Sequence, residues 1–469
     1  MNLSRRELLK QSGCGFASLA FAGLATAESA QSGFTSSLAA RLPMFAARAK
    51  RVIFVFMGGG PSHMDTFEYK PALFQSDGKE YDFTGVRFGT FGKESKRKLM
   101  KPMWGFNQYG ESGRWVSDLF PHIAQHVDDL CFLHGMHTEG VAHGPATLFL
   151  HTGATNLVRP SIGSWITYGL GTENQNLPGF VSIGPSATKG GPRNYGNAFL
   201  PAIYQGSPLG QATRPETQKN FKHLTSAASL DDRLRQQKFL RELNELQLDR
   251  LAGDDRLEAV ISSYELTARM QEKAPQVLDT SGETADTLAT YGLDNPKTRD
   301  FGHQCLLARR FAESGVRYIQ VNYTDESPNP PWDQHDNMPK HADHALATDK
   351  PVAGLLSDLK QRGLLDDTLV WWGAEFGRTA FTQNKNGRDH NPRGFTSFLA
   401  GGGTKQGFAY GATDEIGEIA VEGKVHMHDL HATVLHCLGL DHEQLTYRYA
   451  GRDFRLTDVA GRIVKEILV

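Results

Sequence analysis

The stretch that decides the fold is Arg51-Val-Ile-Phe-Val-Phe-Met57, which is followed at once by Gly58-Gly59-Gly60. All residues after the arginine are apolar, and many are β-branched or aromatic. An apolar run of this length that ends at glycines predicts a strand buried on both faces, and therefore a strand of a parallel sheet.

Similar apolar runs recur along the chain, and helical patterns lie between them. Apolar residues at helical spacing cover 352–359, before Gly363, and 428–438, before Gly439. Strands that alternate with helices predict an α/β fold, with a mostly parallel central sheet flanked by helices. The runs that we predict as further strands are 129–133, 316–323, 368–373 and 395–400.

Residues 215–300 differ from the rest because they are polar and largely helical in pattern. Ser229 is suited to cap a helix, with Asp231 and Asp232 in its first turn. We expect this segment to be a helical insertion within a single large domain that spans about residues 45–465.

Composition excludes several classes of protein. The 469 residues carry a formal net charge of −2, which argues against nucleic acid as a partner. No stretch after the N-terminal segment is long and apolar enough to predict a membrane span. Of the four cysteines, Cys14 lies in the N-terminal segment; Cys131, Cys305 and Cys437 are far apart, which predicts buried thiols rather than a disulfide framework.

The N-terminal segment has the order of features found in an export signal. Residues 4–10 read Ser-Arg-Arg-Glu-Leu-Leu-Lys, a weakly apolar stretch covers 13–24, and Ala25-Thr26-Ala27 offers a cleavage site. This order predicts a twin-arginine signal over residues 1 to about 30, with the twin-arginine translocase as a partner and a periplasmic or other extracytoplasmic product. The alternative is a cytosolic helix with a chance arginine pair.

Polar residues follow several predicted strands, at the edge where open α/β sheets bind ligands. Ser62, His63 and Asp65 follow the first strand, and a capped turn is their simplest alternative role. Four histidines follow or end the second strand, and any one of them would by itself be read as a hydrogen-bonded core residue. These histidines are His134, His137, His143 and His151.

Carboxylates beside histidine or arginine recur at later strand ends. Asp333 and His335 follow the strand that ends at Tyr323, and Glu375 and Arg378 follow the strand that ends at Gly373. Carboxylate and imidazole groups on such loops can converge on one cation. One such group alone would indicate a surface charge pair, but the repeated placement, which continues with Asp389 and His390, favours a real site.

Several phrases of the chain resemble a known family. These are residues 59–67, 332–335 and 373–379, together with the ending 428–441. The chain is similar to twin-arginine-exported, sulfatase-like proteins filed as a domain of unknown function within the alkaline phosphatase and sulfatase superfamily. The resemblance covers about residues 45–465 and implies an alkaline-phosphatase-like fold.

The resemblance also implies roles for individual residues. Members of the superfamily hold one or two divalent cations at strand ends and hydrolyse phosphate or sulfate esters. Asp333 and His335 resemble the residues of the first metal site, and His390 resembles the late metal-binding histidine. Glu375 stands in for a ligating aspartate, and Asp65 for the first aspartate of the family. A single site for zinc, calcium or manganese is therefore expected.

The predicted nucleophile position departs from the sulfatase pattern. His143 stands where the cysteine or serine precursor of formylglycine would stand, so ordinary sulfatase chemistry is not expected. His143 would instead act as a nucleophile or a general base, and Arg378 would neutralise an anionic group of the substrate.

The leading hypothesis is an exported, metal-dependent hydrolase acting on a sulfate or phosphate ester or a related small anionic or sugar-ester substrate. The alternative is a binding or envelope-structural protein that keeps the fold without the reaction. A redox or cofactor protein is suggested by the export route alone, because no haem, flavin or dinucleotide fingerprint occurs in the sequence.

Overall fold

The computed structural model describes residues 38–83, 96–212 and 255–469, with scattered residues between 214 and 243. The predicted twin-arginine signal lies outside the described residues. So does most of the helix predicted to begin at Ser229. None of the helices in these ranges is long and apolar enough to cross a membrane.

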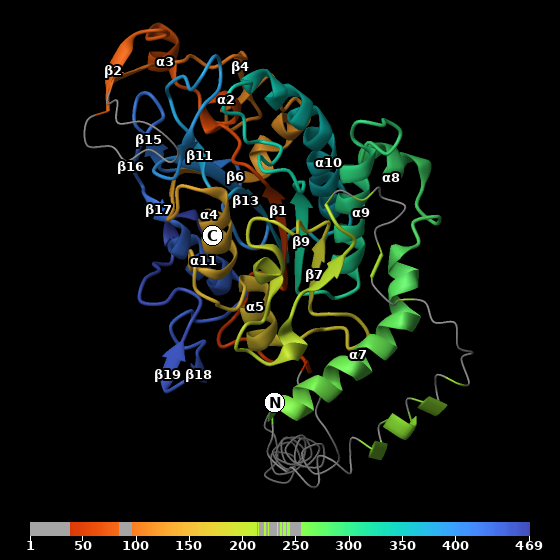
Figure 1. Ribbon diagram of the computed structural model, residues 1–469. Helices are drawn as coiled ribbons and strands as arrows, with labels where there is room; N and C mark the ends of the chain where they lie inside the picture. The colour runs from red at the N-terminus through yellow and green to blue at the C-terminus, as the bar shows by residue number, and fades with distance from the viewer. Residues whose placement is uncertain are drawn as a thin grey trace, which may run out of the picture.

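A central sheet of nine strands is built around β1 (Arg51–Met57), as Figure 1 shows. β1 lies between β10 (Thr368–Gly373) and β9 (Tyr318–Tyr323) and is parallel to both. Beyond β9 follow β7 (Phe180–Ile183) and β8 (Ser207–Leu209), also parallel. Every residue of β1 is buried, which confirms the strand predicted from the apolar run.

The other half of the sheet is mixed. β13 (Phe395–Ala400) runs antiparallel to β10 and to β6 (Leu130–His137). β14 (Phe408–Tyr410) and β17 (Val425–His426) pair with β6 in parallel. The predicted α/β architecture with a largely parallel sheet is therefore confirmed, and the antiparallel β13 is the exception within it.

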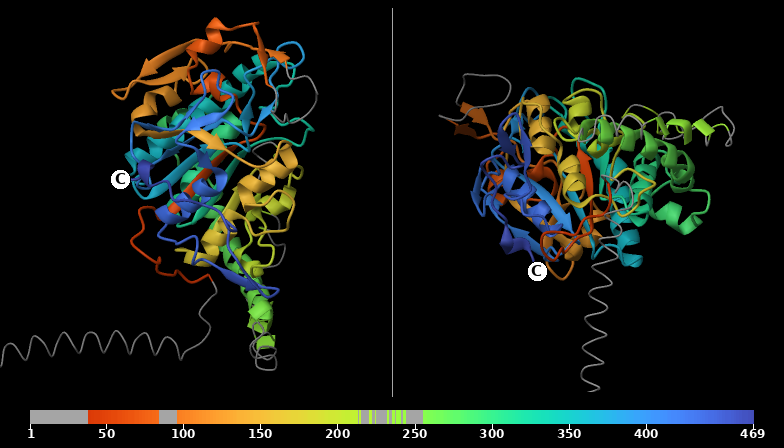
Figure 2. Two further views of the ribbon diagram at one scale, coloured as in Figure 1. Left: turned by 90° about the vertical axis from the view of Figure 1, so that its left-hand side faces the viewer. Right: turned by 90° about the horizontal axis from the view of Figure 1, so that it is seen from below.

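Helices cover both faces of the sheet (Figures 1 and 2). One face carries α4 (His143–Thr152), α5 (Ile162–Leu170) and α11 (Met427–Cys437). The opposite face carries α9 (Arg299–Glu313) and α10 (His341–Gln361), which pack on each other. Both faces of the sheet are thus removed from water, as continuous apolar strands require.

Adjacent tryptophans of β10 anchor the two layers. Because successive side chains of a strand point to opposite faces, Trp371 and Trp372 enter different layers. Trp371 stacks on Phe54 at 4.0 Å between ring centroids, and Phe54 in turn lies 5.7 Å from His151 of α4. Trp372 stacks on Phe398 at 5.1 Å, in the other layer. The described cysteines are buried free thiols, as predicted.

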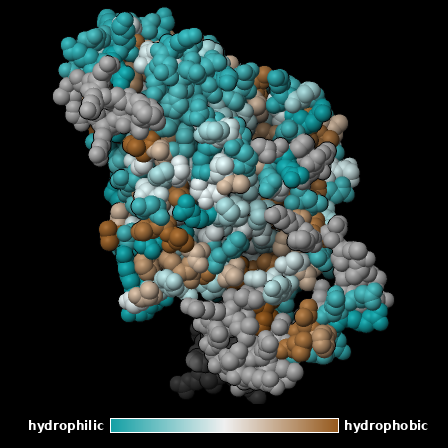
Figure 3. All heavy atoms as spheres, in the orientation of Figure 1, coloured by the Kyte–Doolittle hydropathy of each residue, from teal (hydrophilic) through white to brown (hydrophobic). Residues whose placement is uncertain are grey.

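The predicted insertion contains α7 (Asp255–Leu278) and α8 (Ala285–Thr290), and α7 extends away from the sheet in Figure 1. The face of the molecule seen in Figure 3 is mainly hydrophilic, with smaller hydrophobic areas between. The remaining helices are α2 (His63–Thr66), α3 (Pro71–Gln75) and the 3-10 helices η1 (Ile123–Asp129), η2 (Gly191–Tyr195), η3 (Ala202–Tyr204), η5 (Met338–Lys340) and η6 (Lys465–Ile467). The remaining strands form small hairpins: β2 (Glu80–Asp82) with β3 (Lys96–Lys98), β4 (Phe106–Tyr109) with β5 (Arg114–Ser117), β11 (Gly377–Arg378) with β12 (His390–Asn391), β15 (Ala412–Thr413) with β16 (Ala420–Glu422), and β18 (Tyr447–Tyr449) with β19 (Arg452–Phe454).

Candidate metal centre

Segments that follow different strands meet at the carboxyl edge of β1, β9 and β10. The loop after β9 carries Asp333 and His335, and His143 begins α4 after β6. The β11–β12 hairpin, which follows β10, places His390 opposite Arg378 in its register. Residues separated by up to 247 positions are thereby brought to one point at the edge of the sheet.

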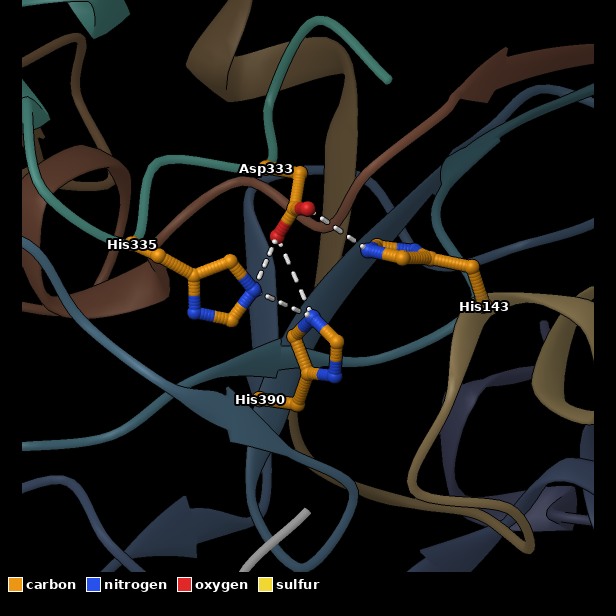
Figure 4. A group of neighbouring side chains, drawn as sticks. All are labelled: His143, Asp333, His335 and His390. Carbon is orange, nitrogen blue, oxygen red and sulfur yellow. Dashed lines mark hydrogen bonds and ion pairs between the residues drawn. The ribbon is translucent and has the colours of Figure 1, made fainter. Parts of the chain in front are cut away.

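Four side chains converge there: His143, Asp333, His335 and His390, which we call the metal-binding cluster (Figure 4). One potential ligand atom from each lies within 4.8 Å of all the others. Asp333 Oδ1 lies 2.8 Å from His335 Nε2 and 3.1 Å from His390 Nε2, and these two nitrogens are 3.1 Å apart. His143 Nε2 faces the other oxygen, Oδ2, at 3.2 Å.

The second nitrogen of each imidazole is held by an acceptor outside the cluster. His390 Nδ1 donates to the carbonyl oxygen of Val141 at 2.8 Å, and His143 Nδ1 donates to Glu375 Oε1 at 2.7 Å. His335 Nδ1 bonds to Gln383 Oε1. Donation from Nδ1 leaves the lone pair on Nε2, the atom that each ring turns into the cluster. This is the arrangement that orients histidines as metal ligands.

The charges of the cluster are strongly coupled. Burial alone would raise the pKa of Asp333, but Arg378 and the three histidines hold it far below its usual range, so the carboxylate is ionised. For His143, burial opposes the charged form, yet the bonds to Asp333 and Glu375 raise its pKa. Burial lowers the pKa of His390 to about 4, despite its bond to Asp333, so this ring is neutral.

The donor set fits a transition-metal ion. Three imidazole nitrogens and one carboxylate oxygen are ligands that zinc takes in tetrahedral sites, where metal–ligand distances of about 2.0 Å separate neighbouring donors by about 3.3 Å. Asp333 Oδ1, His335 Nε2 and His390 Nε2 lie 2.8–3.1 Å from one another, close to that value, and the set that includes His143 lies within 4.8 Å. Calcium prefers six to eight oxygen ligands, which this cluster does not offer. His335, with 19% of its side chain exposed, is the most open of the four.

Glu375 lies beside the cluster and orients one of its members. Besides the bond from His143, it accepts from the backbone N–H of Gly59 at 3.0 Å. Gly59 is at φ +110°, and a Cβ there would lie 2.6 Å from the backbone nitrogen of Asp333. Only glycine allows the first loop to approach both Glu375 and Asp333 so closely.

Arg378 is fully buried behind the cluster. Its guanidinium donates to Asp333 Oδ1 at 2.8 Å and to the carbonyl oxygens of Gly59 and Gly60. These contacts favour a positioning role for Arg378 over the predicted contact with an anionic substrate.

Asp65 is the predicted ligand that the structure keeps apart from the cluster. It lies in α2 and accepts from Arg388 Nε at 2.8 Å and from Ser62 Oγ at 2.5 Å. The backbone N–H of Met103 also donates to it at 3.1 Å. A carboxylate with these partners is satisfied as a buried ion pair that fixes the first loop to the β11–β12 hairpin.

Two features of the cluster do not follow from the sequence pattern. His143 was expected to act on the substrate, and the structure adds it to the group of potential ligands. Gln383 orients His335 from the β11–β12 connection, yet no local pattern singles out a glutamine in a loop as such a partner. Only the folded hairpin brings the two together.

Comparison with models of known protein families assigns the chain to a family. The model of DUF1501, described as a protein of unknown function, matches residues 49–468. No curated protein matches the chain in sequence.

Solved structures resemble the chain only distantly. The lipoteichoic acid synthase LtaP from Listeria monocytogenes is 10% identical, with 90% of this chain and 78% of that chain covered, at a TM-score of 0.37. The PsFucS1 sulfatase from Pseudoalteromonas sp. is 10% identical over 84% and 68% of the two chains, at 0.35. A protein in the alkaline phosphatase superfamily from Vibrio parahaemolyticus is 10% identical over 86% and 70%, at 0.34. At such TM-scores these likenesses assign no activity.

Proposed function

The chain belongs to the DUF1501 family of proteins of unknown function, and we propose that it is a metal-dependent hydrolase acting on a sulfate or phosphate ester or a related anionic substrate. One observation carries the proposal: three imidazole nitrogens converge on one buried, ionised carboxylate at the carboxyl edge of the sheet. This edge is where open α/β sheets place their ligands.

Within this proposal Asp333, His335 and His390 hold a divalent cation, with zinc or manganese favoured over calcium by the donor set. A bound cation would polarise an ester oxygen and lower the pKa of a bound water molecule. Asp333 supplies the anionic ligand. It stays ionised because the guanidinium of Arg378 lies against Oδ1, the oxygen that His335 and His390 also face. Glu375 and Asp65, first expected as weaker ligands, act as orienting and structural carboxylates in this arrangement.

His143 is the proposed general base, with a direct nucleophilic role as the alternative. Its Nδ1–H is held by Glu375 at 2.7 Å, which leaves Nε2 free to accept a proton. A carboxylate that fixes the tautomer of a catalytic imidazole is the logic of hydrolase triads. Because the pKa of His143 is raised, the ring holds a proton strongly once it has taken one.

The site of action is proposed from the N-terminal segment. The arginine pair in residues 4–10, the apolar stretch and the small-residue cleavage pattern support export by the twin-arginine route. The hydrolase would then act in the periplasm or elsewhere outside the cytoplasm.

A direct test is a screen of sulfate, phosphate and phosphonate esters with protein loaded with zinc or with manganese. His143→Gln should lower kcat by at least about 100-fold, as expected for loss of a general base. His134→Gln is a matched control, because His134 bonds to Thr396 and has no place in the cluster. Equal loss in both variants would contradict the role of His143.

A non-catalytic binding protein is the second candidate. It is favoured by the histidine at position 143, where sulfatases carry the precursor of their nucleophile. Inactivity toward the whole ester panel, in protein that holds its metal, would favour this alternative.

A further inference from the structure

A small cavity adjoins the metal-binding cluster through Glu375, which lines the cavity and also bonds to His143. Thr147, one turn after His143 on α4, forms part of the same wall. The cavity has a volume of about 20 Å³, enough for one water molecule or one hydroxyl group. Any group placed in it would therefore lie next to the proposed reaction centre.

The floor of the cavity contains an amide oxygen without a donor. His151 Nδ1 donates to the carbonyl oxygen of Thr147 at 2.8 Å, so its Nε2 must accept. Gln320 Nε2 donates to His151 Nε2 at 2.9 Å and also to Asn322 Oδ1 at 2.6 Å. Both N–H groups of the Gln320 amide are therefore used. Its oxygen, Oε1, has no hydrogen-bond donor within the described part of the chain, although the residue is only 2% exposed and lines the cavity.

A second amide and a cation complete the wall. Asn194 Nδ2 donates to the carbonyl oxygen of Lys189 at 3.1 Å, and its buried Oδ1 has no donor among the residues described. The ammonium group of Lys189 bonds to the carbonyl oxygen of Ser327 and to Thr188 Oγ1, which leaves one of its three N–H groups for a ligand. Lys189 itself adopts φ +48°, an uncommon conformation for a residue other than glycine.

An unpaired acceptor and a cationic donor match the needs of a hydroxyl group, which donates one hydrogen bond and accepts others. The cavity offers a choice of two such acceptors. A buried acceptor left unpaired destabilises the protein, so a ligand that fills the cavity with a hydroxyl group gains from satisfying it. A second anionic group would instead meet the unpaired amide oxygens and Glu375.

We propose, resting on the hydrolase function above, that this cavity recognises a hydroxyl group adjacent to the scissile ester, so that the substrate is an ester of a polyhydroxylated alcohol such as a sugar. Gln320 or Asn194 accepts the one O–H of that hydroxyl group, and Lys189 donates to its oxygen. These three residues select the alcohol part of the substrate, while the metal-binding cluster takes the anionic part.

The test is equilibrium binding, measured by titration calorimetry on the full chain loaded with zinc or with manganese. The probes are a panel of monosaccharide sulfates and phosphates, compared with phenyl sulfate and phenyl phosphate, which carry no hydroxyl group. The variants are Asn194→Ala, in η2, and Lys189→Ala, just before η2 in the cavity wall. Lys297→Ala, an exposed lysine in the connection between α8 and α9, is the matched control.

We expect at least one sugar ester to bind about ten-fold more tightly than the phenyl ester of the same anion. Asn194→Ala and Lys189→Ala should each weaken the sugar ester about five- to ten-fold and leave the phenyl ester unchanged, and Lys297→Ala should change neither. Equal affinity for sugar and phenyl esters, binding of neither, or equal weakening of both would overturn the proposal and leave the cavity with a resident water molecule only.

Calorimetry measures binding and does not depend on hydrolysis, so the proposed hydrolase function and the proposed hydroxyl site can be contradicted independently. Sugar-ester selectivity without hydrolysis contradicts the proposed reaction and keeps the cavity assignment. Hydrolysis without selectivity keeps the reaction and removes the assignment.

Discussion

Two groups of histidines lie in this molecule, and they differ in what their nitrogens face. In the metal-binding cluster, three Nε2 atoms turn toward Asp333, and each Nδ1 is held by an acceptor. The second group, which we call the ring stack, packs imidazoles tilted or edge to face against one another, with centroids 5.0–5.8 Å apart. The ring stack consists of His137, His426, His428 and His431.

Within the described chain, no carboxylate forms an ion pair with more than one ring of the ring stack. In this group, His426 Nε2 faces Glu139 at 3.7 Å. Burial lowers the pKa of His428 to about 4 and that of His431 to about 3, so these rings are neutral and serve as packing. The comparison teaches that a high density of histidines does not make a site; a common carboxylate and fixed tautomers do.

Removing the shared carboxylate should abolish this difference. Asp333→Ala leaves three imidazoles without an anionic ligand and Arg378 without its buried partner, so we expect bound metal to be lost. Metal content after dialysis against a weak chelator measures the effect. His428→Ala in the ring stack is the control and should keep its metal; loss from both variants would show that the two groups do not differ as described.

Truncating the ring stack should affect stability instead of metal binding. His431 is fully buried and donates to the carbonyl oxygen of Leu150 at 2.8 Å. We expect His431→Ala to lower the free energy of unfolding by about 2–4 kcal/mol, as for other large-to-small core changes. Urea denaturation measures it, with metal content as the second readout. A stable variant that has lost its metal would contradict the packing role.

Loosening the orientation of His143 should have a smaller effect. Glu375→Gln keeps the shape of the side chain but weakens the bond that fixes Nδ1–H of His143. Loss of such an outer partner typically costs 10- to 100-fold in metal affinity or activity. Competition with a fluorescent chelator would measure the affinity. Wild-type affinity and activity together would show that Glu375 does not orient His143.

Acidification should separate the two groups through different observables. The raised pKa of His143 means that this ring gains a positive charge beside the cation as pH decreases, so metal affinity should fall by up to about ten-fold per pH unit through that value. His428 and His431 have depressed pKa values, so the unfolded chain binds more protons below about 6.5. Stability from the ring stack should therefore decline as pH falls from about 6.5 toward 4. Chelator competition and urea denaturation across pH test the two trends, and a metal affinity independent of pH would contradict the first.

The sheet could be predicted from sequence wherever local pattern decides the structure. The largely apolar runs at 51–57, 368–373 and 395–400 form β1, β10 and β13 with the predicted bounds. β6 and β9 differ by a few residues at their ends, where hydrogen bonding to neighbours decides where a strand stops. The antiparallel direction of β13 could not be predicted, because apolar runs in parallel and antiparallel strands look alike.

The candidate site could be predicted only for residues that directly follow strands, because open α/β sheets bind ligands at the carboxyl ends of their strands. Asp333, His335 and His390 follow strands of the sheet or the hairpin beyond them, and the structure brings them together. Asp65 follows a strand in the same way, yet Arg388, 323 residues later, binds it instead. The full burial of Arg378 likewise depends on the loop of Gly59 folding over it. Such long-range partners leave no local signal in one sequence.

The most direct test of the account is elemental mass spectrometry of the full chain and of two variants, purified without chelator. The account predicts about one zinc or manganese ion per chain in the wild type, none in His335→Ala, and an unchanged amount in His428→Ala of the ring stack. A wild type that neither carries nor takes up metal, or a His335→Ala variant that keeps its full complement, would contradict it.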